Sequence, residues 1–282
     1  SLTEYTDALA ALEAEGGFDL LALDGVSEED FVGLDAAIRS WAITNNEAGR
    51  YVMAVVGGGG TELTNSDVFG AIARSALYDT EWVVNIGVTG LNVIAPCGNV
   101  LALSPAQCAP RMAGRIASAG IAGSITFSEV TDVDSVNGPA APAQIEQLIN
   151  QGVTVFSKRG SAVRIEDGVT TFTSLTTEKD FTFTQVRAVR AIQQIGLDIN
   201  QIVENGWIGR KINTTTVRDS LVATLQTYFK DLEAKGVLVN GTQVAIDTRY
   251  DNTKTNVFVL VLAQFQFELK RVLLTVRVPT VS

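Results

Sequence analysis

The sequence predicts an α/β protein: a domain built on a mainly parallel sheet, followed by an α+β domain of two long helices and a small β-sheet. Three observations predict it. Short apolar runs alternate with helical patterns through the first half, two long helical patterns follow residue 180, and strand patterns come last. A length of 282 residues accommodates two domains, which we place at residues 1–170 and 171–282.

The first half alternates between helix and strand patterns. Gly16-Gly17 ends a first amphipathic helix, and apolar runs such as 51–56 are typical of strands covered on both faces. Ser27 precedes three acidic residues, a pattern that favours the start of a helix. We predict helices over residues 2–14, 27–46, 65–78 and 105–118, and strands over 18–23, 51–56, 82–86, 91–95 and 124–127.

The middle of the chain begins with a break in this pattern. Residues 132–142 are rich in Gly, Pro, Ala and Asp, which predicts a loop. A helix over 143–150 follows. Residues 153–159 and 162–167 are predicted to pair as strands around a turn at Gly160-Ser161, and the chain stays extended to about residue 177.

Two long amphipathic helices characterise the second half. Apolar residues spaced by three and four predict one face of a helix over 180–204 and of another over 214–235. The first stripe comprises Val186, Val189, Ile192, Ile195, Ile199 and Ile202, and the second Val217, Leu221, Leu225, Tyr228 and Leu232. Gly236 is placed to end the second helix.

The last forty residues carry strand patterns over 243–249 and 256–262, and then alternate between apolar and polar residues. In the last predicted strand, one face carries Val272, Leu274, Val276 and Val278. An apolar strand at this position leaves a sheet edge open, and such an edge favours strand exchange between subunits. The alternative is that this strand pairs within its own domain.

Composition excludes several classes of function. The sequence contains no histidine, which removes Ser-His-Asp and Cys-His catalysis and His-ligated zinc or haem sites. A net charge of -10 and a pI near 4.6 argue against nucleic acid as a main partner. No apolar run approaches the roughly 20 residues of a membrane span, and no secretory signal opens the sequence. We expect Cys97 and Cys108 to be small buried thiols, with one disulfide as the alternative.

One motif keeps an enzymatic alternative open. Gly57 to Gly60 lie between a predicted strand and a predicted helix, as a phosphate-binding loop does, so the rival reading is an α/β enzyme or nucleotide-binding protein. Neither GxxxxGK[ST] nor a clean GxGxxG accompanies these glycines, and the nucleophile elbow G-x-S-x-G is missing. The acidic residues from Asp24 to Asp35 match no calcium loop. We therefore predict no catalytic residue, no metal site and no cofactor.

Basic residues gather in and after the first long helix, against the acidic background of the chain. This group, Lys179, Arg187, Arg190, Arg210 and Lys211, is predicted to form a docking surface for an acidic partner subunit. The alternative is a solvated helix face with local salt bridges.

A distributed pattern in the second half resembles the C-terminal domain of contractile phage tail sheath proteins, above all those of Gram-positive prophages and phage-tail-like particles. It comprises Asp180-Phe181, Val186-Arg187, Arg190-Ala191-Ile192, Asp198-Ile199, Ile202, Glu204, Ile208-Gly209-Arg210, Asn213, Arg218, Leu221, Tyr228, Leu232, Gly236 and Leu238. Residues 5–14, 18–21 and 51–57 are similar to the earlier part of the same family.

The resemblance implies a structural subunit of a virion tail sheath, assembled in the host cytoplasm. Such subunits stack as helical rings of six around the tail tube, and terminal arms add strands to the C-terminal domains of neighbours. Contraction drives the tube through an envelope, with the C-terminal domain inward and the α/β domain outward. The implied partners are other sheath subunits, the tube, the baseplate and the tail terminator. The family normally has an arm, and often another domain, before the point where this sequence begins, so we expect these 282 residues alone to form a monomer or small oligomer.

Overall fold

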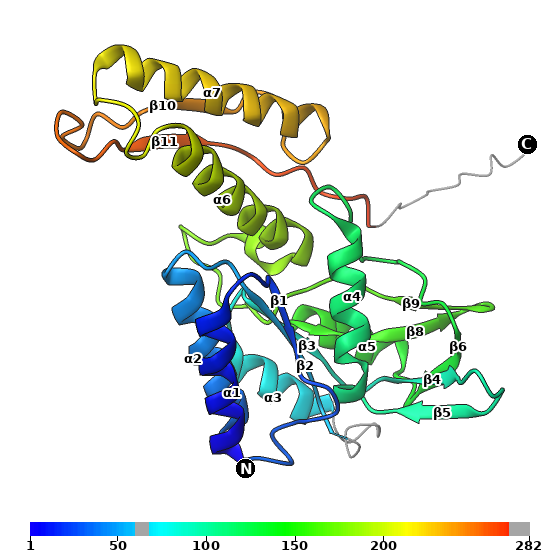
Figure 1. The fold of residues 1–282 in the computed structure, drawn as a ribbon. Coiled ribbons are helices and arrows are strands. Elements are labelled where there is room, and N and C mark those ends of the chain that lie inside the picture. The colour runs from blue at the N-terminus through cyan, green and yellow to red at the C-terminus, as the bar shows by residue number, and fades with distance from the viewer. Residues whose placement is uncertain (60–67, 271–282) are drawn as a thin grey trace, which may run out of the picture.

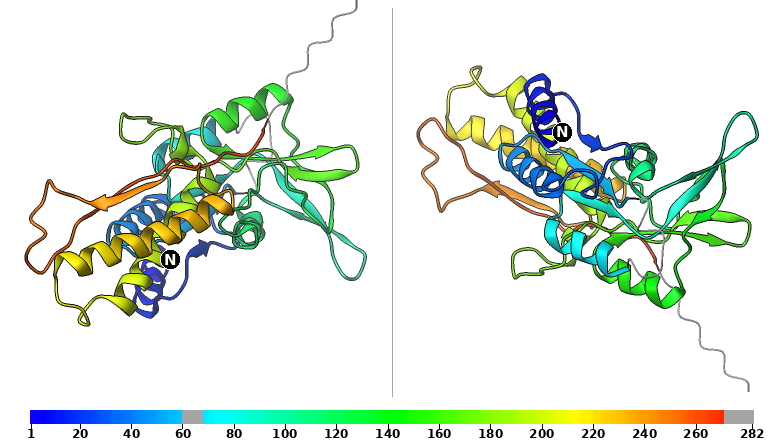
Figure 2. Two further views of the ribbon diagram at one scale, coloured as in Figure 1. Left: turned by 90° about the horizontal axis from the view of Figure 1, so that it is seen from above. Right: turned by 90° about the horizontal axis from the view of Figure 1, so that it is seen from below.

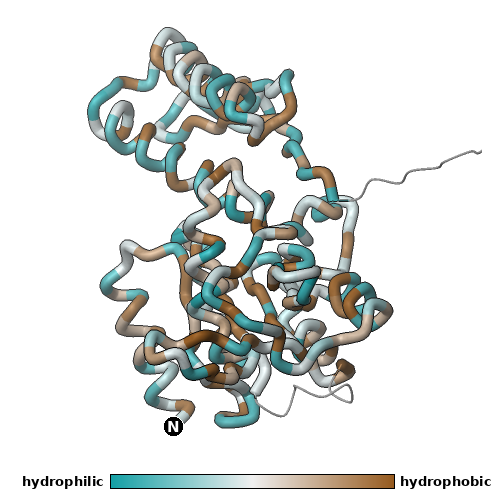
Figure 3. Tube along the Cα trace, turned by 90° about the vertical axis from the view of Figure 1, so that its right-hand side faces the viewer, coloured by the Kyte–Doolittle hydropathy of each residue, from teal (hydrophilic) through white to brown (hydrophobic). Residues whose placement is uncertain are grey.

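The computed structural model describes residues 1–59 and 68–270, which form two lobes (Figure 1). The α/β lobe comprises residues 1–59 and 68–185, and the C-terminal lobe comprises residues 186–270. Viewed from the side, a narrower neck joins the two lobes (Figure 3). Within the described residues, no helix combines the length and the apolar character that crossing a membrane requires.

A four-stranded parallel sheet forms the centre of the α/β lobe. Its strands are β1 (Leu20–Ala22), β2 (Met53–Gly57), β3 (Val83–Ile86) and β7 (Val153–Thr154), in the order β1-β2-β3-β7. Every residue of β2 and β3 is buried. The continuous apolar runs predicted these strands because a parallel sheet is covered on both faces. The predicted fold class is confirmed.

Helices cover both faces of this sheet. On one face α1 (Leu2–Glu15) and α2 (Leu34–Glu47) pack against alternate residues of β2, Ala54 and Val56. On the other face α4 (Ala109–Ala119) packs against Met53 and Val55. The remaining helices, α3 (Val68–Tyr78) and α5 (Pro142–Asn150), pack together beside β7.

Antiparallel strands extend the lobe at one end, on the side away from α1 and α2 (Figure 2). A three-stranded sheet has the order β5-β4-β6, with β4 (Gly90–Ile94), β5 (Val100–Leu103) and β6 (Val133–Asn137). The predicted hairpin is confirmed as β8 (Phe156–Arg159) and β9 (Ala162–Ile165). The predicted loop over 132–142 is wrong, because β6 pairs with β4 there, and residues 124–127 do not form the predicted strand.

The helix predicted from residue 27 begins only at Leu34. The acidic residues that suggested an earlier start bind backbone groups of the preceding turns instead. Asp30 accepts a hydrogen bond from the Ser27 amide (2.8 Å), and Glu28 accepts one from the Asp35 amide (2.8 Å). Gly33, with φ at 93°, adopts the left-handed conformation that precedes the helix. These carboxylates therefore accept hydrogen bonds from free amides, as expected, but the amides belong to the turn at Ser27 and to the first residues of α2.

The C-terminal lobe consists of two long helices over a small sheet. These are α6 (Val186–Gly206), α7 (Thr215–Ala234), β10 (Gln243–Ile246) and β11 (Val259–Leu262). The first predicted helix begins at Val186 rather than at residue 180, because Phe181–Thr184 form a 3-10 turn capped by Asp180. The predicted apolar stripe of α7 faces the core through Leu221, Leu225 and Leu232.

Helix α6 belongs to the cores of both lobes. Val186 and Val189 pack with the parallel sheet, whereas Ala191 packs with α7. Gln193 fastens the helix further, donating a hydrogen bond to the Val52 carbonyl (2.9 Å). One helix therefore joins the two lobes without a linker, and the division into domains at residue 170 stays a prediction.

Candidate subunit interface

The sheet of the C-terminal lobe has open edges. Within the described part of the chain it contains β10 and β11 alone, paired antiparallel from Gln243 with Leu262 to Ile246 with Val259. Each strand thus offers one edge of backbone groups that no described strand pairs with. Two-stranded sheets are marginal in isolation, and open apolar edges favour the addition of another strand.

An apolar groove of about 660 Å³ lies between α6, α7 and β11. Leu221 and Leu225 form its buried base, while Val259 and Val261 of β11 stay half-buried in its wall. Other half-buried apolar residues line it from α6 and the following turn: Ile199, Val203 and Trp207. The core of this lobe is therefore incomplete on the side of β11, where further apolar side chains would be buried.

The connection between α6 and α7 carries exposed apolar and basic side chains together. Ile208 and Ile212 are 63% and 83% exposed, and Arg210 and Lys211 lie between them. Neither basic side chain forms a hydrogen bond or ion pair with the described residues. The connection is held in place from behind, since Asn213 donates a hydrogen bond to the Asn252 carbonyl (2.8 Å).

The other three basic residues of the predicted docking group contact groups of the same chain. Lys179 lies 2.6 Å from the buried carboxylate of Glu81. Arg190 pairs with the carboxylate of Asp19 on the α/β lobe. The Arg187 side chain is largely buried and lies beside Glu268. The structure thus leaves the side chains of Arg210 and Lys211 together at the surface without partners among the described residues, and pairs the other three with groups of the same chain.

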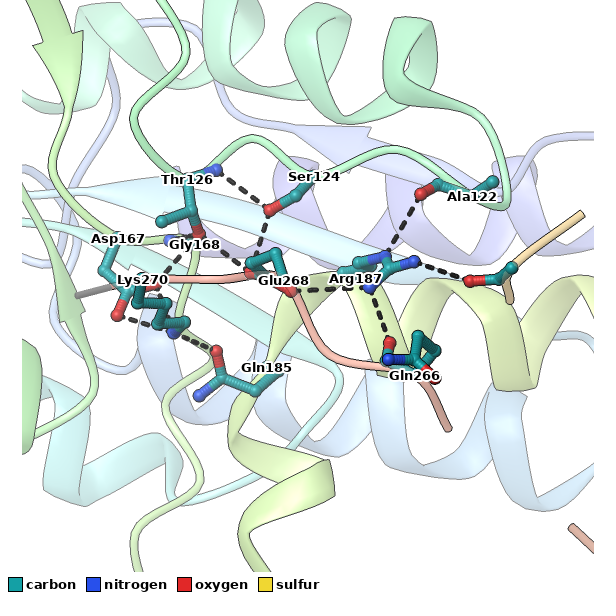
Figure 4. A network of polar contacts seen from close by, with 11 residues as sticks. Ala122, Ser124, Thr126, Asp167, Gly168, Gln185, Arg187, Gln266, Glu268 and Lys270 are labelled. Atoms are coloured by element: carbon teal, nitrogen blue, oxygen red, sulfur yellow. Dashed lines mark hydrogen bonds and ion pairs between the residues drawn. The ribbon is translucent and has the colours of Figure 1, made fainter. Parts of the chain in front are cut away.

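Arg187 lies where three distant segments meet (Figure 4). Its guanidinium donates hydrogen bonds to three backbone carbonyls, those of Ala122 (3.1 Å), Gly236 (3.1 Å) and Gln266. Its side chain is 13% exposed, and it also lies 3.6 Å from the carboxylate of Glu268. A planar guanidinium suits this position because its several donors point in different directions.

Two further side chains fasten the segment that follows β11 to the α/β lobe. Glu268 accepts hydrogen bonds from Ser124 (2.9 Å) and Thr126 (3.2 Å). Lys270 lies 2.6 Å and 2.7 Å from the two carboxylate oxygens of Asp167 and also bonds to Gln185. We call Arg187, Glu268 and Lys270, with Ser124, Thr126 and Asp167, the arm anchor.

The environment of Glu268 lowers its pKa. Burial acts to raise the pKa, but hydrogen bonds from its own backbone, from Ser124 and from Thr126, together with the charge of Lys270, outweigh burial. The carboxylate is therefore ionised at neutral pH and balances the positive charges of Arg187 and Lys270.

Over residues 267–270 the chain buries its polar side chains more than its apolar ones. Glu268 and Lys270 are half-buried, whereas Phe267 and Leu269 are 38% and 81% exposed. The predicted strand-exchange residues, Val272, Leu274, Val276 and Val278, come next in the sequence and lie outside the described residues. Sequence reasoning missed the anchor: the alternation showed that Glu268 shares a face with Gln264 and Gln266, but not what that face contacts.

In the described part of the glycine loop, which the enzymatic alternative requires to bind a ligand, Gly57 and Gly58 contact other parts of the protein. Gly57 packs against the backbone of Pro105 and Ala106 so closely that a Cβ has no room. The Gly58 amide donates to the Ile86 carbonyl (3.1 Å), so that amide is not directed at a phosphate. Gly60 lies outside the described residues, and among the described ones no group of Asp, Glu or Cys is arranged to hold a metal ion.

The two cysteines are free and differ in environment. Cys108 is buried, and burial raises the pKa of its thiol to about 12. The expectation that both thiols are buried is wrong for Cys97, which is exposed between β4 and β5.

Comparisons with known proteins agree along the length of the chain. A family model described as the phage tail sheath protein central domain matches residues 2–171, and one described as the phage tail sheath C-terminal domain matches residues 178–279. The tail sheath protein of Clostridium phage phiCD119 is 25% identical over 137 residues, which are 49% of this chain and 38% of that protein.

Solved structures share the fold. The sheath tail protein of Desulfitobacterium hafniense superposes with a TM-score of 0.73 at 19% identity, over 94% of this chain and 60% of that one. The helical sheath of the anti-feeding prophage in its contracted state gives a TM-score of 0.69 at 15% identity, over 96% and 73%. The chain thus spans 38% of the curated phage relative and 60% of the D. hafniense protein.

Proposed function

This chain belongs to the phage tail sheath family, and on that premise we propose that it is a non-catalytic structural subunit that polymerises around a tail tube. In the proposal, subunits stack as hexameric rings and contract to drive the tube through a cell envelope. The partners are further copies of the chain, the tube protein, the baseplate and the tail terminator. The site of action is the tail sheath of a virion or related particle, assembled in the host cytoplasm.

The observation that carries the proposal is the incomplete sheet of the C-terminal lobe. The free edge of β11 lies beside an apolar groove, and the arm anchor, which directly precedes residues 271–282 in the sequence, lies outside that sheet. Val272, Leu274, Val276 and Val278 of one copy would add a strand to β11 of another, with apolar side chains entering the groove. Main-chain hydrogen bonds would supply affinity, and the alternating side chains would set the register.

A second contact of the proposed subunit is with the tube. Arg210 and Lys211, flanked by the exposed Ile208 and Ile212, form a basic and apolar tip that a fixed loop presents. Such a tip suits an acidic surface with apolar patches. Arg187 and Arg190 would contribute to docking indirectly, by holding the lobes together behind it, and Lys179 by its ion pair with Glu81 within the α/β lobe.

Proline at position 274 tests the strand exchange. In particles that carry this sheath, Leu274→Pro removes one backbone donor and fixes φ, so we expect electron micrographs without sheathed tails. Leu274→Ile is the matched control, because it keeps the backbone donor and an apolar side chain of the same volume, and we expect normal sheaths. Far-UV circular dichroism of the isolated chains checks that both variants fold. Normal sheaths with Leu274→Pro would show that strand exchange through this residue is not needed.

A further inference from the structure

After β11 the chain continues extended, away from the open edge of its own sheet. Residues 263–270 run from β11 towards the α/β lobe and reach the end of α4 (Figures 1 and 2). From residue 257 to 270 the sequence is VFVLVLAQFQFELK, which contains no Gly, Pro, Asn, Asp or Ser. These are the residues that turns require, so the segment is built to continue extended and not to fold back beside β11.

Backbone pairing directs the first part of this segment to the end of α7. The Val239 amide donates to the Gln264 carbonyl (2.8 Å), and the Gln266 amide donates to the Val237 carbonyl (2.9 Å). Leu238 and Phe265 form the antiparallel bridge between these bonds. The chain is therefore already held in one direction before it reaches the arm anchor.

The arm anchor then fixes the segment on the other lobe. The Lys270 and Asp167 side chains are 22% and 14% exposed, so their pair is shielded from solvent far more than an ordinary surface pair. Glu268 and Lys270 are separated by 144 and 103 positions from their partners Ser124 and Asp167. Only the folded α/β lobe brings these partners together, so the segment is anchored to that lobe and not to the sheet that it leaves.

Length alone would not keep the following residues from their own sheet. Residues 271–282, fully extended at about 3.3 Å per residue, reach roughly 40 Å, which exceeds the span of a small lobe. An arm of that reach has two possible acceptors, β11 of its own chain and β11 of another copy. The local concentration of the acceptor on its own chain is high, so self-pairing is favoured unless geometry opposes it.

We propose that the arm anchor is a positioning device that holds the root of residues 271–282 on the α/β lobe and directs them to another copy of the chain instead of to their own β11. The anchor and the pairing with 237–239 hold residues 263–270 extended away from β11, and this geometry opposes self-pairing. The inference rests on the proposed strand exchange. It adds the contacts that select β11 of another copy as the acceptor over β11 of the same chain.

Asp167→Asn tests the anchor in the isolated chain. The substitution keeps the shape of the side chain but removes the charge that holds Lys270. We expect trypsin to cut after Lys270 about ten-fold faster than in the wild type, because a charge-assisted contact has been weakened. Mass spectrometry separates this cut from the cut after Arg271.

Two matched variants control this measurement. Asp231→Asn removes the partner of Lys235, a Lys–Asp pair at the end of α7 whose side chains are 57% and 55% exposed, and should leave cleavage at Lys270 unchanged. Asp167→Glu retains the charge and should restore most of the protection. Cleavage after Lys270 at the wild-type rate in Asp167→Asn would overturn the anchor.

Amide exchange of residues 271–282 in dilute monomer tests the choice of acceptor. We expect fast exchange in the wild type and slowed exchange in Asp167→Asn, whose released arm pairs with its own β11. The same variant in particles should give fewer sheathed tails. Unchanged exchange together with normal sheaths would overturn the directing role. If wild-type particles formed sheaths without strand exchange, the proposed strand exchange would fail, while trypsin cleavage would still report on the anchor.

Discussion

Arg187 illustrates how single side chains hold this protein together. It leaves the first turn of α6 and binds carbonyls of the segment after α4, the turn after α7 and the segment after β11. These carbonyls come from both lobes and from the root of the proposed arm. Because the side chain is 13% exposed, little water is available to replace it. Its removal would leave several polar groups without partners.

The variant Arg187→Met should therefore lower the free energy of unfolding by about 3 kcal/mol, because three backbone carbonyls lose a charged donor and Glu268 loses an ion-pair partner. Urea denaturation of the isolated chain measures this change. Arg210→Met removes the same charge from the exposed α6–α7 connection and should alter stability by less than about 0.5 kcal/mol. Equal losses for both variants would contradict the structural role assigned to Arg187.

At the scale of residues, the sequence predicted chemistry better than contacts. The five basic residues were recognisable as a group because they are close in sequence. Their partners were not: Lys179 pairs with Glu81 and Arg190 with Asp19, at separations of 98 and 171 positions. Charges at such distances in sequence are brought together by the tertiary fold, which periodicity does not encode.

At the scale of elements, α6 is the connection on which the arrangement of the lobes depends. Its predicted apolar spacing was correct, but the stripe serves two different cores, with Val189 on the parallel sheet and Ile199 beside the groove. Between them, Gly196 lies against the ring of Tyr51, and a Cβ would overlap that ring. A glycine inside a helix costs about 1 kcal/mol relative to alanine, and here it permits the close contact of the lobes.

We expect Gly196→Ala to destabilise the protein by about 1–3 kcal/mol, because the helix-propensity gain is smaller than the cost of displacing Tyr51. The matched control is Gly114→Ala in α4, where no atom lies within 4 Å of the added Cβ. That variant should stabilise by about 0.5–1 kcal/mol. Thermal and urea unfolding measure both changes, and stabilisation by both would mean that the contact with Tyr51 is not close.

The elements that sequence reasoning missed lack a pattern of their own. β6 reads VDSVN, with one buried side chain, Val136, and forms because β4 offers an edge to it. Residues 27–33 looked helical because their acidic residues are also suitable for a helix start. Buried strands and long amphipathic helices were predictable since their own residues carry the signal.

At the scale of the whole molecule, acidic pH should lower the stability of the fold by protonating carboxylates. The sequence contains no histidine, so no side chain of that type titrates between pH 5 and 8. The pKa of Glu268 is lowered in the folded chain, where Arg187, Lys270 and Asp167 surround it. A group whose folded pKa is depressed stabilises the fold above its unfolded pKa, and that contribution disappears as pH falls through the folded value.

Stability should accordingly change little between about pH 7 and pH 5 and decrease below about pH 4, near the ordinary glutamate pKa of 4.5. Urea midpoints at several pH values measure this. Glu268→Gln should be less stable than the wild type at neutral pH, and the difference should shrink in acid. A difference that grows in acid would contradict the lowered pKa.

In the whole molecule, the sheet of β10 and β11 has a free edge, and the segment that follows β11 is held on the α/β lobe by the arm anchor. The fold of each lobe was predictable from patterns and from the family resemblance. The groove beside β11 and the arm anchor were not, because both are formed where α6, α7 and the segment after β11 meet the α/β lobe. Phe267 and Leu269 are apolar side chains that the single molecule leaves exposed, at the point where the proposed contact with another copy begins.

The most direct measurement is a cryo-EM map of the assembled sheath at a resolution that traces the backbone around β11. The account predicts residues 271–282 of another copy hydrogen-bonded along the free edge of β11, with Leu274 among the side chains in the groove. A map in which that segment pairs with β11 of its own chain, or in which the edge of β11 carries no added strand, would contradict it.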